Sequence, residues 1–281
     1  MKAFHARSLQ TTMRELGSSM IDRETLPCPV LSELAPRLVR SNELLDALPP
    51  TARGRLQERR LAVHANDVLF DCHQQTRDVY FPSRNTVLSL VRTTDEGPQV
   101  EVGMVGSEGF AGLDVMLARG TQNETATIVQ TGGEVACISA RLLHAEFSSE
   151  PQTRMLISAY AGMFLEHVSQ TAVCNGVHTI AQRLAKWLLA LHERTASTDL
   201  VVSHEALSRI LGTQRPAVTL AIGALTNAEV IAHSRRSIHL HNLPALRARA
   251  CACSQSMHDS LSAFRAQLGN AGRASARPVT D

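Results

Sequence analysis

Short runs in which apolar and polar residues alternate fill the chain between residues 67 and 139. The runs are DVLFDC, DVYFP, TVLSLVRT, QVEVGMV, TATIVQT and EVACIS, and turn sequences such as TDEGP, GSEG and TGG separate them. Half-buried strands of this length, punctuated by polar turns, are typical of an antiparallel barrel or jelly roll. The preceding stretch, from ELLDALPP onward, predicts short helices that lead into the first strand. We therefore predict a β-roll domain over residues 41–150.

The period of the pattern changes after residue 150. In TRMLISAYAGMFLEHVSQTAVC the apolar residues recur at intervals of three and four, which predicts a long helix over residues 151–176. The residues on this stripe are Met155, Leu156, Ala159, Met163, Val168 and Ala172. Such a stripe either pairs with the same helix of a second copy or packs on the chain's own barrel, and we favour pairing in a dimer.

Residues 177–250 predict a helix-turn-helix followed by a small hairpin. TIAQRLAKWLLALHER forms an amphipathic helix, the strand LVV follows, and Ser203 is placed to cap the helix HEALSRIL. Gly212 can supply the positive φ of a tight turn, after which a second helix runs to Ala228. Pro216 falls in the first turn of that helix, where its missing N–H leaves no hydrogen bond unmade.

The start of the second helix carries the candidate base-reading residues. They are Gln214, Arg215, Ala217 and Thr219, with Ser203 nearby on the first helix. Arginine suits a guanine edge, glutamine an adenine edge, and threonine a phosphate or a thymine methyl group. In EVIAHSRRSIHLHN, Arg235 and Arg236 occupy the tip of a predicted wing, where they would contact phosphates. The alternative is a small helical domain with surface arginines, which this combination of elements disfavours.

Charge is distributed unevenly along the chain. Residues 1–177 carry 16 Lys and Arg against 20 Asp and Glu, whereas residues 178–250 carry 9 against 4. The second region also contains six histidines. A net of +5 over the predicted winged region is consistent with binding to a polyanion, and the acidic first part must then do something else.

Several segments of the sequence resemble the Crp/Fnr superfamily of bacterial transcription regulators. They lie within residues 45–250 and are VYFPSRNTVLSLV, EVGMVGSEGFAGL, QTAVCNGVHTIAQRLAKWLLALHER and HEALSRILGTQRPAVTLAIGALTNAEVI. The resemblance implies an α+β fold with an N-terminal β-roll of cyclic-nucleotide-binding type, a long dimerisation helix and a C-terminal winged helix-turn-helix. It also implies a homodimer that binds an inverted repeat in double-stranded DNA, with RNA polymerase as a candidate further partner.

The sequence departs from the family where cyclic AMP would bind. Leu113 follows FAG in place of the glutamate that binds the ribose, and Asp114 is one position late. The expected Arg-Ser pair is replaced by QNETAT, which puts Asn123 or Glu124 where a cation should face the phosphate. We therefore predict a degenerate effector pocket for an unidentified small molecule other than cyclic AMP. Its residues are Gly106, Gly109, Gly112, Leu113, Asn123, Glu124 and Thr125.

The recognition helix also departs from the family pattern. Arg215 stands where the family also has an arginine. Pro216 stands in place of an acidic residue that reads cytosine in the family, and Leu220 in place of a second arginine. The resemblance therefore implies a target sequence different from the familiar ones.

The six cysteines predict neither a disulfide framework nor a metal site. Only Cys28 precedes Cys72, which excludes the iron–sulfur branch of the resembling family on ligand count. Cys251 and Cys253, with His239, His241 and His258 nearby, could form a metal or redox site, but Cys-x-Cys lacks the usual zinc spacing. We favour buried packing thiols, and the same holds for Cys174.

The remaining features of the sequence limit the kinds of function we expect. No enzyme motif, cofactor motif, secretory signal or membrane-spanning run is found, so we expect a cytoplasmic protein that is not an enzyme. Residues 1–40 predict a flexible arm and residues 251–281 a tail, with GNAGRASARPVTD disordered. The competing hypothesis is a ligand- or metal-sensing module whose winged domain binds a protein.

Overall fold

The computed structural model describes residues 41–72, 74–93, 99–118 and 125–275, and the predicted N-terminal arm with Cys28 lies outside these ranges. Within them, no helix is both long and apolar enough to cross a membrane. The first part of the chain contains α2 (Glu43–Ala47), α3 (Pro50–Arg55), β1 (Arg59–Val63), β2 (Val68–Phe70), β3 (Asp78–Pro82), β4 (Val87–Arg92), β5 (Val100–Val105), α4 (Leu113–Ala118), β6 (Ala126–Thr131), β7 (Gly133–Ser139) and α5 (Ala140–Ser149).

The strands of this part form two antiparallel sheets. One has the order β1-β7-β3 and the other β2-β6-β4-β5. Alternation places Leu88, Val105, Val129 and Val135 inward, where they are buried together with Tyr80. The predicted β-roll is therefore confirmed, and β2 to β7 coincide with the alternating runs of the sequence. Strand β1 does not, because it lies in the stretch that was predicted to form short helices.

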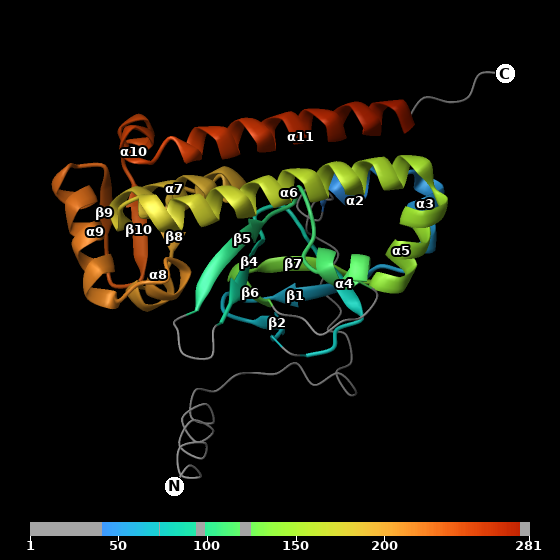
Figure 1. Cartoon of the computed structure of the whole chain (residues 1–281), viewed down its shortest axis with the longest axis horizontal. Coiled ribbons are helices and arrows are strands. Elements are labelled where there is room, and N and C mark those ends of the chain that lie inside the picture. Colours follow the sequence, from blue (N-terminus) through green and yellow to red (C-terminus); the bar gives the residue numbers. More distant parts are fainter. Residues whose placement is uncertain (1–40, 73, 94–98, 119–124, 276–281) are drawn as a thin grey trace, which may run out of the picture. The chain divides into compact units, whose positions relative to one another are not determined.

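The long helix α6 (Pro151–Val177) follows the sheets (Figure 1). Pro151 occupies its first turn, and the Glu150 side chain accepts a hydrogen bond from the Gln152 backbone N–H. The predicted apolar stripe does not form a single face. Leu156 and Met163 are buried in the chain's own core, whereas Met155 and Ala172 are exposed. One side of α6 therefore packs internally and another side faces outward.

The C-terminal segment forms a helix where the sequence predicted a disordered end. Helix α11 (Cys253–Ser275) lies beside α6 (Figure 1) and includes residues 269–275 of the GNAGRASARPVTD segment, for which the prediction is wrong. The reason is a stripe at helical spacing, Leu261, Phe264 and Leu268, that is buried in the same core as α2 and α6. Residues 276–281 lie outside the described ranges.

The winged part follows α6 and precedes α11 along the chain. Its elements are α7 (Ile180–Thr195), β8 (Asp199–Val201), α8 (His204–Ile210), α9 (Arg215–Asn227), β9 (Ile231–His233), β10 (Ser237–Leu240) and α10 (Leu243–Arg249), with the sheet order β8-β10-β9. A capping box between Thr179 and Gln182 begins α7. Leu184, Leu188 and Ile222 are fully buried in the core of this part.

A buried carboxyl group joins the winged part to the β-roll. Glu101 of β5 accepts hydrogen bonds from Ser89 of β4 at 2.5 Å and from the Trp187 indole N–H of α7 at 3.1 Å. Burial raises the pKa of Glu101 to about 7, although these two hydrogen bonds act in the opposite direction. The contact between α7 and the β-roll therefore contains a group that titrates near neutrality.

We expect the stability of the protein to depend on this group. Since the pKa of Glu101 in the folded chain, about 7, exceeds its ordinary value of 4.5, its contribution is complete below the ordinary value and is lost as the pH rises through 7. Thermal unfolding of wild type and Glu101→Gln between about pH 5 and pH 8 should show wild type losing stability relative to the variant.

Glu205→Gln serves as the control, because Glu205 is exposed and pairs only with Arg209 on the surface. Its unfolding curve should follow that of wild type at every pH. Parallel pH profiles for wild type and Glu101→Gln would contradict the role assigned to Glu101.

Candidate nucleic-acid interface

Helices α8 and α9 form the predicted helix-turn-helix. The Ser203 hydroxyl accepts a hydrogen bond from the Ala206 backbone N–H at 3.1 Å, which confirms the predicted cap. Gly212 has φ +55°, and a Cβ at this position would overlap the Val100 side chain of β5. Both the conformation and the space at the turn therefore require glycine. Pro216 lies in the first turn of α9, as predicted.

The start of α9 presents polar side chains to solvent. Gln214, Arg215 and Thr219 are exposed and Ala217 is partly exposed, while Val218, Ala221, Ile222 and Leu225 face the core. Leu220 is 76% exposed beside them, although it is a large apolar residue. The buried stripe of α9 therefore fixes which side of the helix is available to a partner.

The wing is the hairpin of β9 and β10. Its turn is closed by a hydrogen bond from the Ser234 backbone N–H to the Ser237 carbonyl at 2.8 Å and by the hydroxyl groups of the same residues. Arg235 and Arg236 are exposed at the tip, where the sequence predicted them.

A concave surface of about 380 Å³ connects the wing to the starts of α8 and α9. It is lined by Ser203, His204, Glu205, Arg215, His233, Ser234, Arg235 and Arg236. Four of the seven predicted DNA-binding residues thus share one hollow, and the other three, Gln214, Ala217 and Thr219, lie along α9. Arginines from two elements around a hollow form a surface to which phosphate groups are attracted.

Two histidines in this hollow did not stand out in the sequence. The rings of His204 and His233 have their centroids 6.1 Å apart, and the Thr219 hydroxyl lies 3.3 Å from His204 Nδ1. Burial lowers the pKa of His204, and the nearby His233 and Arg215 lower it further. Only the fold brings these residues together, since they lie 29 positions apart.

The predicted effector pocket is filled in part by the chain itself. Gly106, Gly109 and Gly112 lie in the buried turn after β5, and a Cβ at Gly109 would overlap the ring of Tyr160 from α6. The Tyr160 hydroxyl donates to the Phe110 carbonyl at 2.7 Å. Thr125 is partly exposed. The fully buried Tyr160 ring therefore packs against the glycine-rich turn.

Leu113 and Asp114, the residues at and after the position of the missing glutamate, begin helix α4. Asp114 is exposed because of its position on that helix. Asn123 and Glu124, predicted to face the ligand phosphate, lie outside the described residues.

The glycine-rich turn carries a buried ion pair that the sequence did not reveal. The Glu108 carboxylate contacts the Arg194 guanidinium of α7 at 2.8 Å, with side chains 1% and 4% exposed, and Arg265 of α11 at 3.4 Å. Burial opposes ionisation of Glu108, but Arg194, Arg265 and two backbone N–H groups hold its pKa below the ordinary value.

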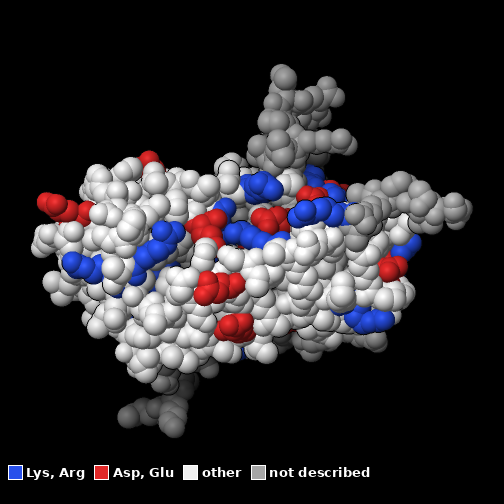
Figure 2. All heavy atoms as spheres, turned by 90° about the horizontal axis from the view of Figure 1, so that it is seen from above, with Lys and Arg blue, Asp and Glu red and all other residues white. Residues whose placement is uncertain are grey.

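Arg265 extends this ion pair to the surface. It also contacts Glu43 at 3.2 Å and Glu193 at 3.9 Å. Figure 2 shows acidic and basic side chains next to one another near the middle of the face that carries α11. Mixed charge of this kind binds the elements of one chain together and does not form the single-sign surface that nucleic acid requires.

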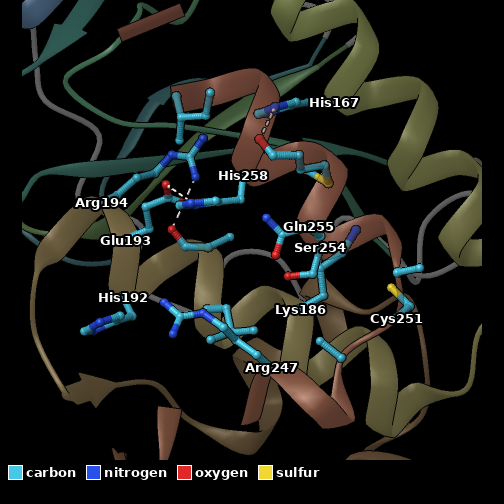
Figure 3. A pocket seen from close by; sticks show the side chains of 16 residues that line it. His167, Lys186, His192, Glu193, Arg194, Arg247, Cys251, Ser254, Gln255 and His258 are labelled. Carbon is cyan, nitrogen blue, oxygen red and sulfur yellow. Dashed lines mark hydrogen bonds and ion pairs between the residues drawn. The ribbon is translucent and has the colours of Figure 1, made fainter. Parts of the chain in front are cut away.

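A second cavity, of about 330 Å³, lies among α6, α7, α10 and α11 (Figure 3). Figure 3 shows the His258 ring directed toward Glu193, with which it pairs at 2.8 Å, and away from Cys251. His239 pairs with Asp199 at 2.7 Å on the winged sheet. Two of the three histidines that the sequence associated with the Cys-x-Cys segment, His239 and His258, therefore pair with carboxylates elsewhere.

Two comparisons with sequences bear on this arrangement. Residues 182–249 match the family model described as a Crp-like helix-turn-helix domain. No curated protein sequence matches the chain. The matched segment comprises most of α7, both helices of the helix-turn-helix, the wing and α10.

Solved structures resemble a larger part of the chain. FixK2 from Bradyrhizobium japonicum has a TM-score of 0.60 at 17% identity, over 70% of this chain and 99% of its own. A Crp/Fnr-family transcriptional regulator from Thermus thermophilus has a TM-score of 0.57 at 18% identity, over 68% of this chain and 98% of its own. CLP from Xanthomonas campestris, described as a c-di-GMP responsive global regulator, has a TM-score of 0.56 at 18% identity, over 66% of this chain and 94% of its own. At sequence identities of 17–18%, the similarity to these structures shows a shared fold and nothing more.

The fold of this chain is thus that of the Crp/Fnr transcriptional regulators, as the sequence resemblance implied. Its winged part matches the Crp-like helix-turn-helix domain. The Thermus thermophilus protein of this fold is described as a transcriptional regulator. The three structures leave more than a quarter of this chain outside the shared fold.

We expect the Glu108–Arg194 pair to be essential for stability. Arg194→Ala leaves a buried carboxylate without its nearest cation and should lower the free energy of unfolding by about 3–5 kcal/mol in denaturant titrations. Arg265→Ala, which removes the more distant and more exposed partner, should cost less. A double variant, Glu108→Ala with Arg194→Ala, should recover part of the loss, and equal losses for all three variants would contradict this assignment.

Proposed function

We propose that the protein is a sequence-specific transcription regulator that binds an inverted repeat in double-stranded DNA as a homodimer. The observation that carries this proposal is the hollow that Arg215 of α9 lines together with the wing arginines Arg235 and Arg236. A helix start with an exposed arginine can enter the major groove, while the wing contacts the flanking phosphates. RNA polymerase is a candidate further partner of such a regulator.

In this proposal the exposed residues of α9 contact different chemical groups of the DNA. Arg215 donates to a guanine edge and Gln214 contacts an adenine edge. The Thr219 hydroxyl donates to the Arg215 carbonyl at 3.1 Å, so its methyl group is the part available to DNA. Exposed Leu220 adds a second apolar contact that suits a thymine methyl group. Ser203 and the wing arginines position the domain on the backbone.

The exposed side of α6 supports the homodimer. Residues spaced alternately by three and four along it are all exposed, namely Met155, Ser158, Gly162, Leu165, Ser169, Ala172 and Gly176. This is the heptad spacing of a two-helix seam, and its small residues allow close approach of a second copy. Leu165, at the centre, is 65% exposed in the single chain. Dimerisation across this face would space the two DNA half-sites by about 34 Å.

The effector is a small molecule other than cyclic AMP in this proposal. Tyr160 fills space against Gly109, and the buried Glu108 is paired with arginines of the chain itself. A cyclic phosphate would have to compete with Glu108 for those arginines.

The direct test is selection of genomic fragments by purified protein at near-physiological salt, followed by sequencing of the retained DNA. An enriched inverted repeat is expected. Recovery of fragments without a common sequence, both from protein alone and after addition of cell extract as a source of effector, would overturn the proposal.

Two arginine variants should fail in different ways on the selected site. Arg215→Ala should remove the preference at one base pair of each half-site, at a cost of roughly 1–3 kcal/mol per half-site. Arg236→Ala should weaken binding to every sequence alike and reduce the salt dependence of binding. Arg249→Ala removes the same charge from exposed α10 and is the control. Identical effects of all three variants across a panel of sites would contradict these roles.

The dimer seam has its own test. Leu165→Glu places a charge at the centre of the exposed α6 face and should convert the dimer into a monomer in sedimentation experiments. Leu117→Glu, at another exposed leucine on α4, should leave the dimer intact. A wild-type protein that sediments as a monomer at micromolar concentration would refute the seam.

A further inference from the structure

Three cysteines and a histidine converge where α6 meets the start of α11. They are Cys174, His178, Cys251 and Cys253, and one ligating atom of each lies within 4.8 Å of all the others. Cys174 and His178 are one turn apart at the end of α6, so their side chains share a face. Cys251 and Cys253 flank the beginning of α11 and approach that face from the other side.

Two of the separations are close to those required around a single tetrahedral ion. The sulfur atoms of Cys174 and Cys251 are 3.8 Å apart, and the Cys253 sulfur is 3.8 Å from His178 Nδ1. Zinc bonds of ~2.3 Å to sulfur and ~2.0 Å to nitrogen at tetrahedral angles give edges of about 3.8 Å and about 3.5 Å. The remaining pairs of ligand atoms lie within 4.8 Å of each other.

We propose that Cys174, His178, Cys251 and Cys253 bind one zinc ion in a closed structural site. Three thiolates and an imidazole form one of the donor sets that zinc prefers, with no position left for a substrate. The three cysteines are buried and His178 is half-buried, so the ion is shielded from solvent. Each thiol gives its proton to solvent when it binds the ion.

Neighbouring groups suit a thiolate site. The Gln170 side-chain amide donates to the Cys253 sulfur at 2.7 Å, the kind of outer contact that orients a metal ligand. Burial raises the pKa of the Cys174 thiol, and the positive charge of Lys186 acts in the opposite direction. Three thiolates around a divalent cation carry a net charge of −1, which the ammonium group of Lys186 offsets.

The position of the site determines what the ion would hold together. The winged domain leaves α6 through His178 and returns to the rest of the chain through Cys251. The ligands therefore bracket both connections of that domain. A bound ion fixes the end of α6, the end of α10 and the start of α11 relative to one another.

The test begins with metal analysis of the full-length protein purified in reducing buffer without chelator. We expect about one zinc per chain in wild type and in Cys72→Ser, a matched control outside the cluster. Cys251→Ser and Cys253→Ser should retain less than a tenth of that amount. His178→Cys should retain zinc, because it replaces one zinc ligand by another.

Cobalt gives a readout that does not depend on the folding of variants. Addition of Co²⁺ to chelator-treated wild type should produce the visible absorption bands of tetrahedral cobalt together with thiolate charge-transfer bands. Zinc should displace this signal at one equivalent, and its binding should raise Tm. Absence of both the bound zinc and the cobalt spectrum would overturn the proposal.

Discussion

A buried negative charge holds the three parts of this chain together. Glu108 lies in the glycine-rich turn of the β-roll, where a lone carboxylate would be strongly unfavourable. Its cations come from elsewhere, Arg194 from the winged domain and Arg265 from α11. The turn, α7 and α11 must therefore be in place at once, and the glycines around Glu108 make this possible because a side chain at Gly106 would overlap the carboxylate or Arg194.

The same turn is packed from within by an aromatic side chain. The Tyr160 ring lies 5.1 Å from the Phe110 ring, measured between centroids, and its hydroxyl donates to the Phe110 carbonyl. Aromatic packing and an internal ion pair therefore occupy the interior beside the glycine-rich turn.

The parts of the molecule that depend on local sequence were predictable. Ser203, Gly212 and Pro216 define the helix-turn-helix through capping, positive φ and first-turn geometry, which act over a few residues. Strands β2 to β7 of the β-roll followed from alternation for the same reason, whereas β1 was missed. The exposed face of α6 was only partly predicted, because a stripe at helical spacing does not reveal which of two neighbouring faces the core will cover.

Features that depend on distant segments were missed. Helix α11 was predicted as a tail because its buried stripe of Leu261, Phe264 and Leu268 is interrupted by small polar residues. The cysteine–histidine cluster joins residues 73 positions apart, so Cys251 was compared with histidines nearer in sequence. The sequence does contain one signal of this cluster. A Cys-x-x-x-His pair precedes the winged domain and a Cys-x-Cys pair follows it, and each pair could supply two ligands to one metal ion.

The meeting of Cys174 with Cys251 also has a consequence for how the chain is assembled. Entry to and exit from the winged domain lie side by side, so the domain is an insertion whose two ends meet. Domains with adjacent termini can be exchanged without disturbing their host, because a short linker closes the gap. Here the winged domain could be replaced only by a domain that also supplies a cation for Glu108 and a hydrogen-bond donor for Glu101, as Arg194 and Trp187 of α7 do.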